Sequence, residues 1–132
     1  MMRREVGESR VGRLATVTAE GHPHVVPCCY ALVGDVIYSA VDHKPKSTLA
    51  LRRLANLRAN PHASLVVDHY ADDWSQLWWV RVDATARIVE SGAEYEDALD
   101  ALAAKYPQYA ETRPEGAVIA LDLTKWTAWP AL

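Results

Sequence analysis

The 132-residue sequence contains no phenylalanine, and its aromatic side chains come instead from 5 Trp and 6 Tyr. Each of these residue types joins a large apolar ring to a polar group, which favours interfaces and ligand pockets. Trp74, Trp78 and Trp79 fall in one stretch, and Trp126 and Trp129 lie near the C-terminus. The pattern indicates an aromatic surface that meets a ligand or a partner.

Long apolar runs and metal-binding spacings are also missing. No run approaches the roughly 18 apolar residues that span a bilayer, and the opening stretch MMRREVGESRVGRLA has no apolar signal core. We therefore expect a cytoplasmic protein that does not enter a membrane. Cys28 and Cys29 are adjacent, which is not the spacing of a metal or redox pair, so we expect two buried thiols on a strand. The 5 histidines are scattered, and no pair has a third ligand beside it, so we expect no metal site.

Sequence motifs of several enzyme classes are absent. The chain has no GxGxxG after a strand, no phosphate-binding P-loop and no GxSxG. Ser47 and the two cysteines have no obvious base nearby in the sequence. These absences argue against a hydrolase that relies on protein groups alone. If the protein is an enzyme, we expect a cofactor to carry the chemistry, and no catalytic residue is assigned.

Acidic residues are absent from one long segment, residues 43–67, which reads HKPKSTLALRRLANLRANPHASLVV. A helix N-terminus beside Lys and Arg is a ready anion site, so this segment indicates an anionic partner such as a phosphate. A nucleic-acid-binding barrel is an alternative, which the net charge of −3 disfavours. The basic residues of the segment are Lys44, Lys46, Arg52, Arg53 and Arg58.

The helical periodicity of this segment separates its cations. Leu49, Arg53 and Leu57 lie on one stripe of a helix, which turns Arg53 toward the interior. A buried cation needs a partner. That partner could be a bound anion or a distant carboxylate such as Asp68 or Asp83. Lys46 lies on the same stripe if the helix has begun there, and Arg52 could still reach a bound phosphate.

Residues 72–84, DDWSQLWWVRVDA, form a second pattern, since alternate residues of a strand share a face. The face with Trp78, Val80 and Val82 is expected in the core. The face with Trp79 and Arg81 suits a flat anionic aromatic ligand through stacking and charge. Cross-strand packing of the tryptophan beside a surface arginine is the alternative interpretation.

Periodicity and turn signals predict one domain over residues 1–132, with a small antiparallel barrel and helices at its rim. Pro23 and Pro27 predict an edge or bulged strand whose free backbone groups could meet a planar ring. Ser91 and Glu94 fit a capping box that starts a helix ending at Pro107. Another helix is expected to begin at Ser47 or Thr48 and to end near residue 59. The six predicted strands are 11–19, 22–33, 36–41, 62–70, 76–90 and 117–123, and residues 126–130 are expected as a short tail.

The order of these segments resembles the pyridoxamine 5′-phosphate oxidase-like flavin and deazaflavin proteins of the split β-barrel superfamily. The resemblance covers about residues 10–130. It rests on VGRLATVTAEGHPHVVPCCYALVGDVIYSAV, on a basic helix ending ANLRANPHASLVVD, and on LWWVRVDATARIV. The stretch DWSQLWWVRVDA is similar to an actinobacterial branch described as probable coenzyme F-420-dependent enzymes.

The resemblance implies a mainly β fold, a six-stranded antiparallel split β-barrel of the FMN-binding type with two to three short helices. It also implies a homodimer with two equivalent cofactor sites at its interface. Arg53 matches the family's phosphate-binding residue, with Lys46 and Arg52 as helpers. Trp79, with Arg81 beside it, stands where the family has a ring-binding glutamine. The other implied cofactor residues are Val25, Val26, Pro27 and Cys28 along the ring, and Tyr38 and Ser39 near the ribityl chain and phosphate.

The function implied by this branch is a coenzyme F-420-dependent oxidoreductase that transfers a hydride between the deazaflavin and a small electron-poor organic substrate. Tyr30 is a candidate proton donor. The alternatives are an FMN-dependent oxidase or reductase of the same fold, and a non-catalytic protein that binds a cofactor, heme or another tetrapyrrole. The family's C-terminal substrate-binding arm has no match in WTAWPAL, so vitamin B6 oxidation is not expected.

Overall fold

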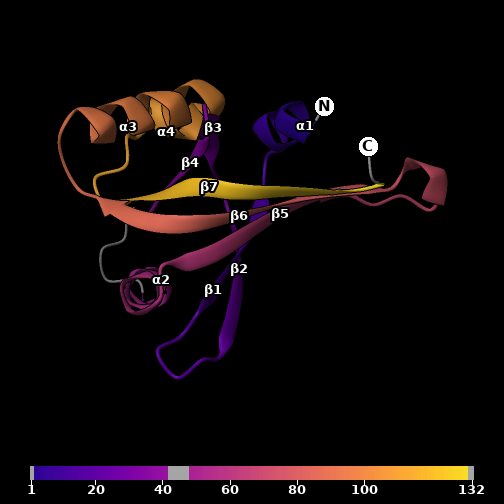
Figure 1. The fold of residues 1–132 in the computed structure, drawn as a ribbon. Coiled ribbons are helices and arrows are strands. Elements are labelled where there is room, and N and C mark those ends of the chain that lie inside the picture. Colours follow the sequence, from indigo (N-terminus) through magenta and orange to yellow (C-terminus); the bar gives the residue numbers. More distant parts are fainter. Residues whose placement is uncertain (1, 42–47, 131–132) are drawn as a thin grey trace.

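The computed structural model describes residues 2–41 and 48–130. Its strands form one curled antiparallel sheet in the order β2-β1-β5-β6-β7-β4-β3 (Figure 1). The strands are β1 (Gly12–Val17), β2 (Pro23–Cys28), β3 (Ala31–Val33), β4 (Val36–Ala40), β5 (His62–His69), β6 (Trp78–Val89) and β7 (Val118–Trp129). The helices are α1 (Met2–Glu8), α2 (Thr48–Ala59), α3 (Ala93–Lys105), α4 (Pro107–Glu111) and the short 3-10 turn η1 (Trp74–Gln76).

This architecture confirms the predicted mainly β split-barrel fold, with seven strands where the sequence predicted six. The expected strand 22–33 is broken at Cys29 and Tyr30, and its two halves lie at opposite edges of the sheet. We call this crossing, residues 28–31, the seam. The two prolines of β2 agree with its edge position, because proline cannot donate a ladder hydrogen bond.

The sheet is covered by helices in two places. The α2 helix contacts β1 and β6, and α3 contacts β3 and β4. In Figure 1 these two helices lie on opposite sides of the sheet. Val6 of α1 and Leu54 and Leu57 of α2 join a core with Leu14 and Val82. A second core lies beneath α3 and α4, and its buried side chains include Tyr38, Tyr95, Leu99, Leu102 and Tyr106.

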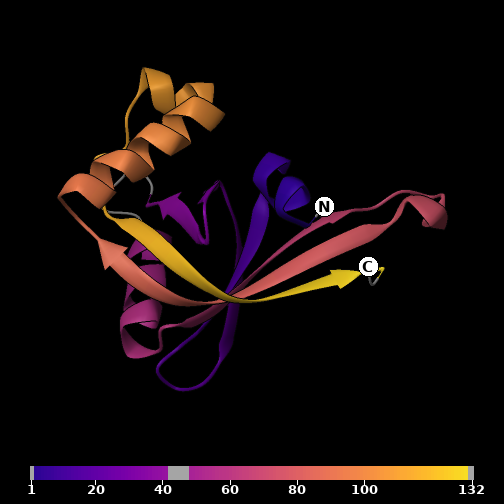
Figure 2. The same ribbon diagram turned by 45° about the horizontal axis from the view of Figure 1, so that its top comes forward.

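The C-terminal ends of β5 and β7 and the N-terminal end of β6 extend away from α2, α3 and α4 (Figure 2). We call this extension the aromatic arm, residues 66–81 together with 126–129. Residues 126–129, expected in a short tail, belong to β7, because its pairing with β6 continues past an irregularity at Asp83 and Ala84. This pairing places Trp129 opposite Trp79.

Two other expectations are wrong, and two short helices were missed. The capping box does not form, because Gly92 caps α3 with φ 95° and Glu94 pairs instead with Arg87. The predicted pair of buried thiols is divided, since Cys28 ends β2 in the core and Cys29 is exposed just beyond it. The short helices α1 and α4 were not predicted.

The helices of the described residues include none that is long and apolar enough to cross a membrane.

Candidate functional site

Arg53 lies on α2, half-buried, near the thiol of Cys28. Burial raises the pKa of Cys28, and the positive charge of Arg53 opposes that rise. Neither carboxylate suggested as a partner reaches Arg53, because Asp68 pairs with Arg13 at 2.6 Å and Asp83 accepts a hydrogen bond from Ser64 at 2.6 Å. Within residues 2–41 and 48–130, Arg53 makes no hydrogen bond or ion pair. It is therefore a half-buried cation that pairs with no acid of the described residues.

Ser39 belongs to the same group of side chains. It is 1% exposed, its hydroxyl donates to the Cys29 carbonyl oxygen at 2.8 Å, and it is hydrogen-bonded to the Cys28 thiol. The adjacent Tyr38 points to the other face of β4, where its hydroxyl donates to Glu94 at 2.7 Å. Burial and this carboxylate raise the pKa of Tyr38 to about 12. Ser39, Cys28 and Arg53 therefore lie close together, whereas the hydroxyl of Tyr38 is hydrogen-bonded to Glu94 of α3.

The predicted ring-lining residues lie in the edge strand β2. Alternate backbone groups of an edge strand point away from its only neighbour and are free to bind another molecule. Val26 is half-buried toward the core, and Val25 is 62% exposed on the opposite face. Pro27 lacks a backbone N–H and faces outward with Val25. The strand thus offers a backbone edge beside the group formed by Ser39, Cys28 and Arg53.

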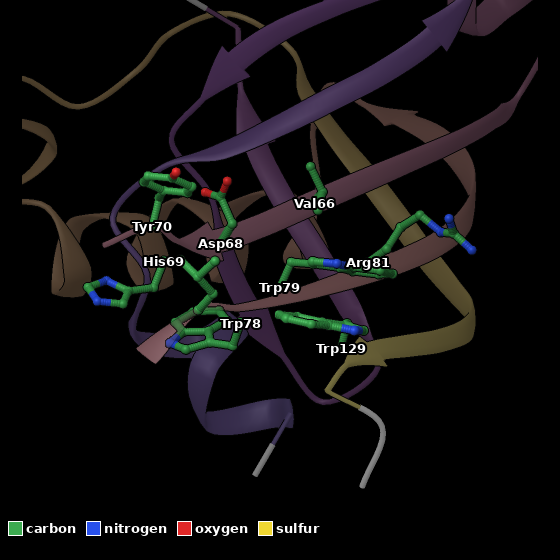
Figure 3. A pocket seen from close by; sticks show the side chains of 9 residues that line it. Val66, Asp68, His69, Tyr70, Trp78, Trp79, Arg81 and Trp129 are labelled. Atoms are coloured by element: carbon green, nitrogen blue, oxygen red, sulfur yellow. The ribbon is translucent and has the colours of Figure 1, made fainter. Parts of the chain in front are cut away.

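Trp79 and Arg81 lie on the outer face of β6, and the buried Val80 and Val82 point inward, as the alternation predicted. The Arg81 guanidinium sits 5.9 Å from the centre of the Trp79 ring and 3.5 Å from the Asp83 carboxylate. Figure 3 shows both side chains beside Trp129. They border a hollow of about 630 Å³ in the aromatic arm. The residues that line this hollow are Val66, Asp68, His69, Tyr70, Leu77, Trp78, Trp79, Arg81 and Trp129.

The predicted site residues therefore form separate groups within one chain. The group around Arg53 and Cys28 faces the inner side of the sheet, whereas Trp79 and Arg81 face the outer side. Three strand spacings, about 14 Å in all, also separate β2 from β6. Arg52 lines a third place, between α2 and the β1–β2 hairpin. Lys46 lies outside the described residues.

Tyr30 is not available as a proton donor to a substrate. It is fully buried, and its hydroxyl donates to the carbonyl oxygen of Val6. Burial raises the pKa of Tyr30 far above its ordinary value. The Nζ of Lys105 sits 4.0 Å from the centre of the Tyr30 ring, and burial, with the charge of Arg10 next, lowers the pKa of this amine to about 8.

Sequence reasoning missed Lys105, because its only signal is a tertiary contact between residues far apart in the chain. Metal chemistry has no obvious location in the described part of the chain, where no three His, Cys, Asp or Glu side chains gather as ligands.

The curled antiparallel sheet, with its open edge strand and the cation-bearing α2 helix beside it, is the FMN-binding split barrel fold. The sequence matches the pyridoxamine 5′-phosphate oxidase family over residues 1–130, and the chain belongs to that family. No curated protein matches the chain.

Several solved structures are similar. A conserved hypothetical protein of Mycobacterium tuberculosis, Rv2991, is 21% identical with a TM-score of 0.77, covering 96% of this chain and 80% of that one. The heme storage protein HutZ of Vibrio cholerae is 18% identical with a TM-score of 0.74, covering 97% and 90%. A structure described as an F-420 reductase is 21% identical with a TM-score of 0.65, covering 95% and 94%. At these identities the likeness establishes the fold.

Proposed function

We propose that the protein is a coenzyme F-420-dependent oxidoreductase, in which a hydride passes between the bound deazaflavin and a small electron-poor organic substrate. The observation that carries this proposal is Arg53. It is half-buried on α2, next to the Cys28 thiol, and no carboxylate of the described residues pairs with it. A desolvated guanidinium binds a phosphate strongly, often through two parallel hydrogen bonds.

The residues present fit a phosphate-bearing cofactor of this kind. Arg53 would hold the phosphate, and the open backbone edge of β2 over Val25–Cys28 would meet the polar rim of the ring. Trp79 offers stacking where the family has a hydrogen-bonding glutamine, which favours a deazaflavin over ordinary FMN oxidase chemistry. The similarity to an F-420 reductase supports the same choice.

We further propose that the cofactor site is shared between two copies of the chain. Within one protomer Arg53 and Trp79 lie on opposite sides of the curled sheet, which favours a site where a cofactor held by Arg53 meets the Trp79 of a second copy. The aromatic arm exposes 72% of Trp74, 71% of Tyr70 and 46% of Trp129, which is much apolar surface for a monomer. A second copy would cover these rings and bring its Trp79 and Arg81 to the β2 edge.

A bound deazaflavin would supply two-electron hydride chemistry. The protein's own residues then orient the reactants and exclude water rather than act as nucleophiles. Arg53 would hold the cofactor phosphate, and the β2 backbone would orient the ring. The aromatic arm of a second copy would cover the site. The proton donor is a water or a side chain that is not assigned.

Titrating the purified protein with F-420 and with FMN, and following tryptophan fluorescence, tests this function. We expect micromolar binding of F-420. The Arg53→Gln variant should bind at least about tenfold more weakly, because a desolvated charge-assisted contact is lost. Arg58→Gln is the matched control, since Arg58 lies on the same helix, is exposed and faces Glu90 at 4.0 Å. Micromolar binding of FMN with none of F-420 would contradict the deazaflavin assignment and favour a flavin enzyme of the same fold.

A non-catalytic heme-binding function is a second candidate, because His69 lines the hollow of the aromatic arm. Its imidazole stacks on Trp78 with ring centres 6.3 Å apart, in an otherwise mainly apolar setting. Histidine is a common axial ligand of heme iron, and HutZ, a similar structure, is a heme storage protein. A Soret band on adding hemin that disappears in His69→Ala would favour this function; no band, or an unchanged one, would exclude this His69 site.

A further inference from the structure

A hollow of about 380 Å³ lies between α2 and the β1–β2 hairpin, at the end of β2 away from Cys28. His24 and Cys28 face the same side of β2, four residues or about 13 Å apart. The hollow is therefore distinct from the place proposed for the cofactor phosphate. Its lining residues are Thr18, Ala19, Glu20, His24, Arg52, Ala55 and Asn56.

One residue that lines the hollow has a buried polar atom without a hydrogen-bond partner among the described residues. The Nδ1 of His24 is shielded from solvent, and no described atom bonds to it. Buried imidazole nitrogens in proteins are nearly always hydrogen-bonded, so an unpaired one in a residue that lines a hollow marks that residue as a candidate for binding a ligand or water. His24 stands opposite Thr16 on β1, whose hydroxyl accepts a hydrogen bond from the Asn56 amide at 3.3 Å.

Other hydrogen-bond donors surround this imidazole. Asn56 is 5% exposed and uses one of its two amide protons on Thr16, which leaves one. The Thr18 hydroxyl accepts from the His22 backbone at 3.0 Å and keeps its own proton to donate. Arg52 adds a permanent positive charge and makes no ion pair with the described residues. These donors, together with a cation that no described carboxylate pairs with, suit an anion.

The charges of the lining select among anions. Arg52 supplies one positive charge, and Glu20 on the hairpin supplies one negative charge that disfavours a doubly charged guest. The methyl groups of Ala19 and Ala55 leave room for a short apolar body. We propose that this hollow is a binding site for a small monocarboxylate, held by Arg52, His24 and Asn56. The proposal does not depend on the deazaflavin function, and it gives Arg52 a role other than helper to the cofactor phosphate.

Butyrate, its neutral isostere butyramide and inorganic phosphate are suitable probes, added to the ¹⁵N-labelled full-length protein while amide NMR shifts are followed. We expect butyrate to shift the amides of Thr18, Ala19 and Ala55 with a Kd of about a millimolar, as suits so small a ligand. Butyramide should bind at least about tenfold more weakly, because it carries no charge for Arg52.

Two variants locate the site. Arg52→Gln and His24→Phe should each weaken butyrate binding about tenfold or more, whereas Arg58→Gln, which removes the same charge from the same helix, should leave it unchanged. The amide spectrum and the melting temperature show whether each variant is folded. Equal losses in Arg52→Gln and Arg58→Gln would reveal only general charge attraction and overturn the proposal. Equal binding of butyrate and butyramide, binding of phosphate alone, or no shifts would also overturn it.

Discussion

At the seam, the backbone groups where a strand breaks are buried and paired within one chain, whereas three rings of the aromatic arm, those of Tyr70, Trp74 and Trp129, are exposed. The Tyr106 hydroxyl lies at the centre of the seam. It accepts from the Tyr30 N–H at 3.1 Å and lies 2.8 Å from the Arg10 carbonyl oxygen and 3.1 Å from the Tyr30 carbonyl oxygen, to which it can donate. In the arm, Trp74 is 72% exposed. The backbone groups of Tyr30 at the seam are therefore paired within a single chain, and the exposed rings of the arm are the surface that the proposed dimer would cover.

The largest effect on stability is expected at the seam. Tyr106 is 7% exposed, and Tyr106→Phe would leave the Tyr30 N–H buried without a partner. We expect a loss of about 2 to 3 kcal/mol in the free energy of unfolding, measured by urea denaturation. Tyr70→Phe removes the same atom from a 71% exposed ring of the arm and should change stability by less than about 0.5 kcal/mol. Equal losses in the two variants would remove the contrast between seam and arm.

Substitutions in the arm should act on association instead. Trp74→Ser and Trp129→Ser each remove an exposed indole ring and leave no cavity in the buried core, so the monomer should keep its fold. Self-association in sedimentation experiments should weaken by about tenfold or more, since tryptophans tend to dominate interface energies. Val33→Ser, at the edge strand β3 and 48% exposed, is the control that should leave association unchanged. A wild-type protein that is monomeric at high concentration would contradict the proposed dimer.

A smaller effect concerns the ion pairs that tie α3 to the sheet. Hydrogen bonds from Arg87 and Tyr38 lower the pKa of Glu94 from 4.5 to about 2. Because the folded-state pKa is the lower one, this stabilisation is present above pH 4.5 and is lost as the pH falls toward 2. Glu94→Gln should flatten part of that acid dependence, by less than about 1 kcal/mol for so exposed a pair. Urea denaturation at pH 6 and pH 3 measures the free energy of unfolding of both proteins. If the difference between the two pH values is the same in Glu94→Gln as in the wild type, the assignment is refuted.

Much of the fold could be predicted because several strands and the α2 helix are encoded by patterns of neighbouring residues. Alternation of apolar residues located β1, β5 and the first half of β6, and helical periodicity turned Arg53 inward because it shares a stripe with Leu49 and Leu57. The break at Cys29 and Tyr30 could not be predicted, since the apolar run continues through it and the Tyr106 hydroxyl that completes the seam comes from 76 residues away. The helix α1 has 7 residues and buries only Val6, which gives no usable periodicity.

The candidate site was predictable in its residue types and not in its arrangement. Charge and spacing singled out Arg53, Trp79 and Arg81 in the sequence. Their placement on opposite faces of one sheet depends on how the sheet curls, which no local pattern encodes. The unpaired Nδ1 of His24, among the described residues, depends in the same way on the packing of α2 against β1.

Mixing two defective variants tests most directly whether Arg53 of one copy and the aromatic arm of another copy form one site. Arg53→Gln and Trp79→Ala should each bind F-420 poorly alone. After subunit exchange in an equal mixture, half of the dimers contain one copy of each variant. If Arg53 of one protomer and Trp79 of its partner share a cofactor, each of these mixed dimers has one intact site out of two. The account therefore predicts recovery of about a quarter of the wild-type F-420 sites. No recovery after verified subunit exchange, with wild type binding normally, would contradict it.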